Sequence, residues 1–182
     1  MALNYIKREK TAVFKLGKCG RIIVSDINQK MLDFGKKRAN SLKIDGFEWV
    51  VADAAKLPFE SGTIDAVTIS FGLRNCPEPE KVLFEAYRVL KTGGRFMCLE
   101  FSDVENPVLS TLYDLYSYNI IPVLGTLIAS DWDAYQYLVE SIRMFYTKKE
   151  LARVMENVGF NMVAYEEILG GIVCIHKGYN LY

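Results

Sequence analysis

Three polar residues stand where buried strands of this chain should end. Asp26 follows the apolar run Ile22–Val24, Asp53 ends "EWVVAD", and Ser70 ends "IDAVTIS". In an open α/β sheet, ligands bind beyond the carboxyl ends of the strands. Asp26 could accept hydrogen bonds from two ribose hydroxyls and Asp53 one from an exocyclic adenine amine, so together they suit an adenosine. Strands also often end in turns that use Asp, so each acid alone could equally be structural.

The usual companion of such a ribose acid is missing. In nucleotide-binding α/β folds the acid follows a glycine-rich turn by about 20 residues. About 20 residues before Asp26 the chain reads "MALNYIKREK", with no glycine. A plain NAD-binding dehydrogenase fits Asp26 but does not explain the absent glycines.

Composition limits the classes of protein. A length of 182 residues fits one domain with a real core. The 22 basic residues balance 22 acidic ones, which argues against a general nucleic-acid binder. Four cysteines without paired spacing and a single histidine favour neither a metal site nor a disulfide framework. We expect no metal and a reducing compartment.

The first residues are basic. Lys7, Arg8, Lys10, Lys15 and Lys18 face one acid within residues 1–20. The segment faintly resembles a mitochondrial presequence but lacks serine and arginine richness. We interpret residues 1–20 as a basic arm or the remnant of a truncated chain, and residues 21–182 as the folded domain.

Strand and helix signals alternate through the rest of the chain. Strands are expected at 21–26, 48–53, 64–70 and 95–101, and the run at 64–70 is typical of a strand buried on both faces. Helical spacing from about 28 to 42 places Met31, Phe34 and Leu42 on one apolar face, and a second helix from Val82 stops before Gly93. A third helix begins with a capping box at Thr147 and Glu150 and ends at Gly159. Two final runs around Gly170-Gly171 predict a hairpin. The pattern predicts a mostly parallel sheet with an antiparallel edge.

One apolar stretch, Pro107–Ala129, is long enough to cross a membrane. Asp114 interrupts it, as do Pro122 and Gly125. A spanning helix needs about 20 mostly apolar residues, so we expect two shorter helices that pack in the core or cover a greasy ligand.

Longer strings are more specific. "ADAAKLPFESGTIDAVTISFGLRN", "AYRVLKTGGRFMCLEFS", "SDWDAYQYLVESIRMF" and "GIVCIHKGY" resemble the UbiE-type C-methyltransferases of ubiquinone and menaquinone synthesis. "YDLYSYNIIPVLGTLIASDW" looks most like the mitochondrial type of coenzyme Q biosynthesis. The resemblance runs from about Arg21 to the C-terminus. It implies a Rossmann-like class I α/β fold with S-adenosyl-L-methionine as cofactor and a polyprenyl methoxy-benzoquinol as substrate.

The resemblance also assigns roles to residues. Asp26 would hold the ribose, Asp53 and Ala54 the adenine, and Ser70 would lie beside the cofactor. Arg74 and Asn75, in "GLRN", would face the substrate as catalytic residues; the alternative for Arg74 is a structural salt bridge. Asp131, Tyr135, Tyr137 and Arg143 would shape the quinol pocket, or instead order a helix. We expect His176 to be a packed structural residue rather than a base, and Cys98 and Cys174 to be core.

The sequence departs from the family before Arg21. The family places a glycine-rich strand and turn there, with helices that cover the pocket, and this chain lacks them. We expect an N-terminally truncated form whose sheet has lost its central strand. The alternative to a C-methyltransferase is a non-catalytic assembly or lipid-binding subunit. By resemblance we also expect a peripheral protein on the matrix side of the mitochondrial inner membrane, in a complex with other coenzyme Q biosynthesis proteins, and a homodimer.

Overall fold

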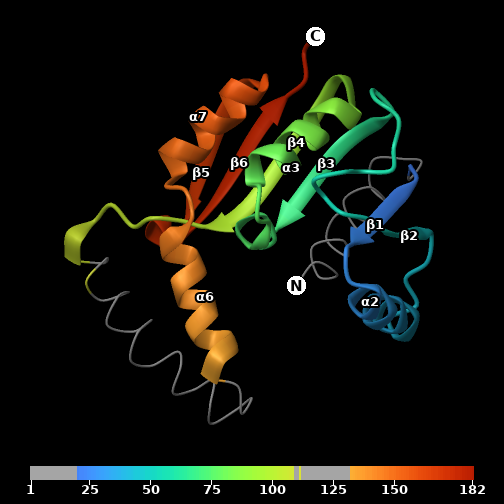
Figure 1. The fold of residues 1–182 in the computed structure, drawn as a ribbon, viewed down its shortest axis with the longest axis horizontal. Helices are drawn as coiled ribbons and strands as arrows, with labels where there is room; N and C mark the ends of the chain where they lie inside the picture. Colours follow the sequence, from blue (N-terminus) through green and yellow to red (C-terminus); the bar gives the residue numbers. More distant parts are fainter. Residues whose placement is uncertain (1–19, 109–110, 112–131) are drawn as a thin grey trace. The chain divides into compact units, whose positions relative to one another are not determined.

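The computed structural model describes residues 20–108, 111 and 132–182; within 132–135 only the backbone is described. The chain separates into two compact units, residues 1–59 and 60–182. The described strands form two sheets, one in each unit, with the orders β1-β2 and β3-β4-β6-β5 (Figure 1). The predicted boundary at residues 20 and 21 stays a prediction.

The first unit is a parallel strand pair covered by one helix. Strands β1 (Ile22–Asp26) and β2 (Phe47–Val51) pair in parallel, and helix α2 (Gln29–Ser41) connects them and contacts both. The helix begins at Asn28, whose side chain accepts a hydrogen bond from the Lys30 amide at 2.9 Å.

The predicted apolar face of α2 is wrong. The buried residues are Leu32, Gly35 and Ala39, whereas the predicted Met31, Phe34 and Leu42 are all exposed. The reason is the close approach of Trp49 to the helix: a Cβ at Gly35 would lie 2.8 Å from the Trp49 ring. Only glycine admits the indole there, and this contact fixes which side of the helix meets the strands.

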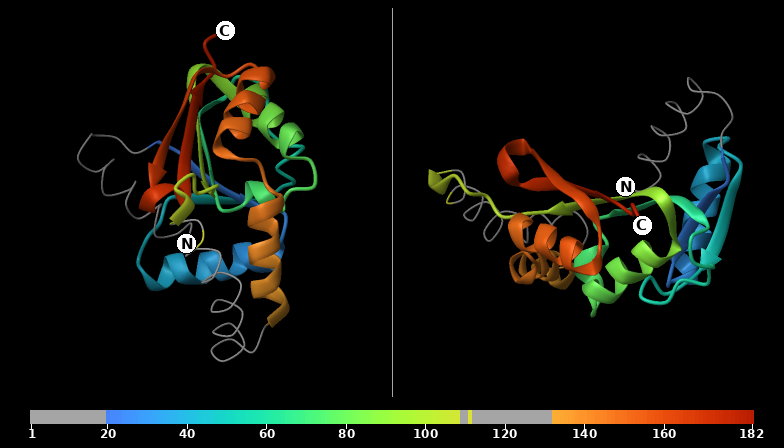
Figure 2. Two further views of the ribbon diagram at one scale, coloured as in Figure 1. Left: turned by 90° about the vertical axis from the view of Figure 1, so that its left-hand side faces the viewer. Right: turned by 90° about the horizontal axis from the view of Figure 1, so that it is seen from above.

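The second unit carries most of the described core. Strands β3 (Ile64–Ser70) and β4 (Leu90–Phe101) are parallel, and β6 (Val173–Tyr179) is antiparallel to both β4 and β5 (Asn161–Ile168). Helices α3 (Pro79–Val89) and α7 (Lys148–Val158) contact each other and cover the same face of this sheet (Figure 2). Leu83, Phe96 and Met155 are fully buried between these layers.

The predicted ends of α7 and the predicted hairpin are confirmed. The capping box of Thr147 and Glu150 is formed, and the left-handed Gly159 ends α7. The hairpin turns at η2 (Leu169–Gly171), where both glycines have positive φ.

The strand at 64–70 is not buried on both faces. Ala66 and Thr68 are exposed, because β3 is the edge of its sheet and helices α3 and α7 cover only one face. The second helix ends at Val89 rather than just before Gly93, and β4 already begins at Leu90. Asn180 stabilises this earlier start, since its side chain donates to the Leu90 carbonyl at 2.9 Å.

Helix α6 (Trp132–Met144) follows the undescribed stretch and contacts the 3-10 helix η1 (Leu73–Asn75). Most of the predicted pair of helices around Pro122 lies outside the described residues. Among the helices that are described, none has the length and apolarity that a membrane crossing requires.

Candidate functional site

Asp26 and Asp53 lie together at one end of the first unit. Asp26 is the last residue of β1 and pairs with Val51 of β2, and its carbonyl accepts a hydrogen bond from the Ala52 amide at 3.1 Å. Asp53 therefore follows directly beyond the carboxyl end of the neighbouring strand. The parallel register brings the two predicted adenosine acids to the same edge.

Each of these carboxylates also orders its own turn. One oxygen of Asp26 accepts from the Asn28 amide at 2.8 Å, and one oxygen of Asp53 accepts from the Ala55 amide at 2.9 Å. Within the described part of the chain, the second oxygen of each acid makes no hydrogen bond. A carboxylate has about four acceptor positions, so the turn and a ligand can share each side chain. Ala54 lies within the second of these turns and is half-buried.

The carboxyl end of β3 carries the other predicted residues. Ser70 is the half-buried last residue of the strand, and Phe71 follows with a left-handed backbone, at φ +53°. The Phe71 amide donates to the Leu99 carbonyl at 2.8 Å, and its ring packs 4.7 Å from the Phe101 ring. A bulky residue with positive φ is strained, and such strain often occurs at functional sites. Here it turns the chain sharply from β3 into η1.

Arg74 forms a buried ion pair with Glu100. Its Nη1 donates to Glu100 Oε2 at 2.9 Å, and the two side chains are 9% and 1% exposed. The guanidinium also lies over the Phe101 ring, 5.3 Å from its centre. The salt bridge that was the structural alternative for Arg74 is therefore present, while the catalytic role stays a prediction.

Asn75 meets one of the predicted pocket residues. The Tyr137 hydroxyl, on α6, donates to Asn75 Oδ1 at 3.2 Å across 62 residues of sequence. Asn75 Nδ2 reaches back to the Phe71 carbonyl at 3.5 Å. Two residues that the sequence assigned to one substrate site are thus in contact.

Of the remaining predicted pocket residues, only Arg143 has a described side chain. Arg143 is exposed and lies in the last turn of α6. Tyr135 belongs to α6, but its side chain is not described, and Asp131 lies outside the described residues. Their assignment to a quinol pocket stays a prediction.

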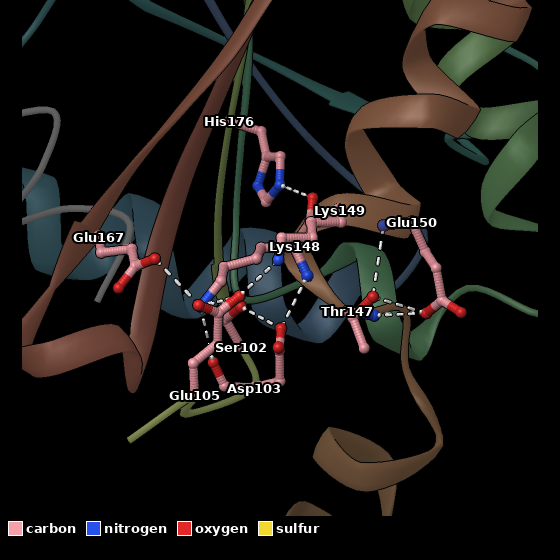
Figure 3. A network of polar contacts seen from close by, with 9 residues as sticks. All are labelled: Ser102, Asp103, Glu105, Thr147, Lys148, Lys149, Glu150, Glu167 and His176. Atoms are coloured by element: carbon pink, nitrogen blue, oxygen red, sulfur yellow. Dashed lines mark hydrogen bonds and ion pairs between the residues drawn. The ribbon is translucent and has the colours of Figure 1, made fainter.

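A second polar cluster surrounds Lys148, the first residue of α7 (Figure 3). Its buried ammonium contacts Glu167 at 3.0 Å, the Asp103 carbonyl at 3.3 Å and Glu105 at 3.5 Å. Its amide donates to Asp103 Oδ1 at 2.8 Å. Burial lowers the pKa of Lys148, but the hydrogen bond to Glu167 and the charge of Asp103 raise it by more. The lysine ties the end of β4 to the hairpin.

His176 is buried in the same cluster. Its Nε2 lies 2.8 Å from the Lys148 carbonyl, and its buried Nδ1 has no hydrogen-bond partner in the described part of the chain. Burial lowers its pKa, so the ring is neutral at pH 7. The packed structural role predicted for His176 is confirmed.

Cys98 and Cys174 are buried, as expected of core residues. Burial raises the pKa of Cys174 to about 11 and that of Cys98 well above its usual value. Both thiols are therefore protonated and unreactive.

Sequence reasoning missed Glu100 and Lys148. A single acid within the apolar run "FMCLEF" is a signal for a buried pair, and Arg74 was the candidate partner. Lys148 carries no such signal, because a lysine at a helix start reads as a surface residue. Among the described residues, no group of three or more His, Cys, Asp or Glu side chains could hold a metal ion.

Comparison with known proteins finds relatives that share about half of their residues with this chain. The 2-methoxy-6-polyprenyl-1,4-benzoquinol methylase, mitochondrial, of Homo sapiens is 52% identical over 162 residues, which is 88% of this chain and 50% of that protein. The protein of that name in Caenorhabditis elegans is 54% identical over 161 residues, 87% of this chain and 56% of its own length. The chain thus spans about half the length of the curated relatives it matches.

Solved structures agree in fold at low identity. A SAM-dependent methyltransferase from Aquifex aeolicus aligns with a TM-score of 0.62 and 17% identity, covering 90% of this chain and 71% of that one. A SAM-dependent methyltransferase of Thermotoga maritima gives 0.61 and 17%, covering 87% and 72%. They confirm the Rossmann-like methyltransferase fold. Residues 10–180 match the family model described as ubiE/COQ5 methyltransferase family, and the chain belongs to that family.

Proposed function

We propose that this chain serves S-adenosyl-L-methionine-dependent C-methylation of a polyprenyl methoxy-benzoquinol ring in ubiquinone biosynthesis. The observation that carries the proposal is the identity of 49–54% to the mitochondrial methylases over nearly the whole chain. The geometry supports it, since two carboxylates with open acceptor positions end adjacent strands.

The cofactor fits the acids of the first unit. Asp26 would accept the ribose hydroxyls, Asp53 and Ala54 would hold the adenine, and Ser70 would lie beside the bound cofactor. When bound, S-adenosyl-L-methionine supplies an electrophilic methyl group. The family's glycine-rich turn, which would hold its amino-acid moiety, is not among these 182 residues.

The residues of the second unit would act on the quinol. Transfer of the methyl group to a ring carbon would need electron density from a ring hydroxyl, whose proton would pass to a water molecule. The ring carbon would then lose its own proton, which the methyl group replaces. The Arg74 guanidinium can stabilise the negative charge on this oxygen, and Asn75, held by Tyr137, can orient a ring hydroxyl. Alignment and exclusion of water supply the rest of the acceleration.

The cellular setting is part of the same proposal. The relatives are named mitochondrial, and we place this protein in the mitochondrion, on the matrix side of the inner membrane. We also propose that the protein forms a homodimer and binds other coenzyme Q biosynthesis proteins in a complex.

Calorimetric titration with S-adenosyl-L-methionine tests the site. It should be run on the 182-residue chain and on a longer form that carries the glycine-rich turn of a relative. In the longer form Asp26→Ala should weaken binding at least about tenfold, because a hydrogen bond to a charged acceptor contributes about 1.5–3 kcal/mol. Asp33→Ala, on the exposed side of α2, is the matched control. Unchanged affinity in Asp26→Ala would refute the ribose assignment.

A further inference from the structure

Glu100 is a buried carboxylate that accepts hydrogen bonds from Arg74 and Phe101. It lies near the end of β4 and is 1% exposed. Its carboxylate accepts from Arg74 Nη1 at 2.9 Å, from the Arg74 amide at 3.3 Å and from the Phe101 amide at 3.2 Å. It therefore holds both the side chain and the backbone of Arg74.

Arg74 is restrained by two contacts, and one donor of its guanidinium has no partner among the described residues. Glu100 holds Nη1, and the Phe101 ring lies against the guanidinium. The Nε atom is buried and makes no hydrogen bond with any residue that the structure describes. A guanidinium is planar with its donors in a fixed fork, so holding one end and one face fixes the direction of Nε–H.

Stability alone is a weak reason for such a pair. Removing two charges from water costs several kcal/mol per ion, and apolar residues of similar volume often replace a buried pair without loss. A buried pair that leaves one donor unpaired is better explained by orientation than by stability. The same 3-10 helix carries Asn75, which contacts Tyr137, so the Glu100 bond to the Arg74 amide also sets this second group.

We infer that Glu100 is a positioning residue, which fixes Arg74 so that its Nε–H is the donor to a hydroxyl oxygen of the aromatic substrate. The inference rests on the proposed function and deepens it. Arg74 was interpreted as a catalytic residue or as part of a structural salt bridge. Both can hold, because the salt bridge would orient the guanidinium toward the substrate.

Nuclear magnetic resonance of the arginine Nε–H groups in the 182-residue chain tests this directly. The signal of Arg74 is identified by its loss in Arg74→Lys, which keeps a cation beside Glu100 but removes Nε. Glu100→Gln keeps the shape and removes the charge, and should speed exchange of the Arg74 Nε–H by about tenfold or more. Should Glu100→Gln fail to fold, Glu100→Asp keeps the charge but shortens the side chain, and the same signal must shift.

The matched control is Asp65→Asn. Asp65 pairs with Lys91 at 2.8 Å and also joins β3 to β4, but both side chains are exposed. This variant should leave the Arg74 signal unchanged.

The second readout is the shift of the Arg74 Nε–H signal on addition of an aromatic substrate analogue. A salt bridge with a structural role alone would not produce this shift. Added 2-methoxyhydroquinone should shift the Arg74 Nε–H signal in the original chain, and Glu100→Gln should abolish that shift. An Arg74 signal unaffected by Glu100→Gln overturns the inference. The inference is also overturned if Glu100→Gln speeds exchange of the Arg74 Nε–H but the hydroquinone does not shift its signal in the original chain. Failure of cofactor binding at Asp26 is measured separately by calorimetry, so it is distinguishable from either result.

Discussion

Lys148→Met should destabilise the second unit. The substitution keeps the aliphatic stem of a residue that is 1% exposed and removes its ammonium group. Glu167, at 3.0 Å, and the Asp103 carbonyl, at 3.3 Å, then lose their donor. The end of β4, the start of α7 and the hairpin are no longer tied together through this side chain.

The expected magnitude follows from the exposure of the partners. Breaking a fully buried ion pair costs about 3–5 kcal/mol, whereas a hydrogen bond to a charged group contributes about 1.5–3 kcal/mol. Glu167 is 42% exposed, so water can rehydrate it after the change. We therefore expect the free energy of unfolding to fall by about 2 kcal/mol, a decrease in Tm of roughly 4–8 °C for a chain of this size.

Urea denaturation followed by circular dichroism measures this change, with Lys149→Met as the matched control. Lys149 pairs with Glu105 at 3.0 Å but is 62% exposed, so its removal should have little effect. Equal effects in the two variants would refute the reasoning. A gain of stability in Lys148→Met would show that desolvation of the ammonium outweighs its contacts.

Three further predictions concern pH, backbone conformation and local stability. The folded pKa of His176 is lowered by burial, so the unfolded chain binds the proton more tightly; stability should fall as pH drops below about 6.5, and His176→Gln should flatten this dependence in urea titrations at pH 5.5 and 7.5. Gly159→Ala should lower Tm more than Gly93→Ala: both positions have positive φ, but only at Gly159 would a Cβ meet a neighbour, the Tyr87 ring at 3.2 Å. Amide hydrogen exchange should be faster in β1 and β2 than in β4 and β6, because the described part of the first unit buries few apolar side chains; equal protection would contradict this.

The element types were largely predictable from the sequence. Turn and cap chemistry is local, so Gly159, Gly170 and the Thr147 capping box gave the ends of α7 and the hairpin correctly. The buried face of α2 was not predictable, because Met31 and Phe34 have the spacing of a core face. The contact of Trp49 with Gly35 decides it, and that contact depends on tertiary structure.

In the candidate site, too, features set by local sequence were predictable and contacts set by tertiary structure were not. The positions of Asp26, Asp53 and Ser70 at or just after strand ends were predictable, because strand ends are visible as changes from apolar to polar residues. The Arg74–Glu100 pair spans 26 residues and the Asn75–Tyr137 bond spans 62. Strand order and the placement of α6 decide such contacts, and neither follows from local spacing.

The division of the described structure into two units has a thermodynamic consequence for the proposed cofactor site. A two-stranded sheet is marginally stable by itself, and α2 is the helix that contacts both β1 and β2 within the described part of the first unit. Asp26 and Asp53 both end these strands, so a ligand that needs their carboxylates in register binds only the ordered form. Its apparent affinity is reduced by the fraction of molecules that are not ordered, and binding in turn stabilises the first unit by mass action. The second unit, with Phe96, Leu83 and Met155 fully buried, holds Arg74 without such help. The proposed ribose and adenine contacts at Asp26 and Asp53 and the geometry of Arg74 therefore belong to different units, and substitutions in the first unit can change these contacts without changing the geometry of Arg74.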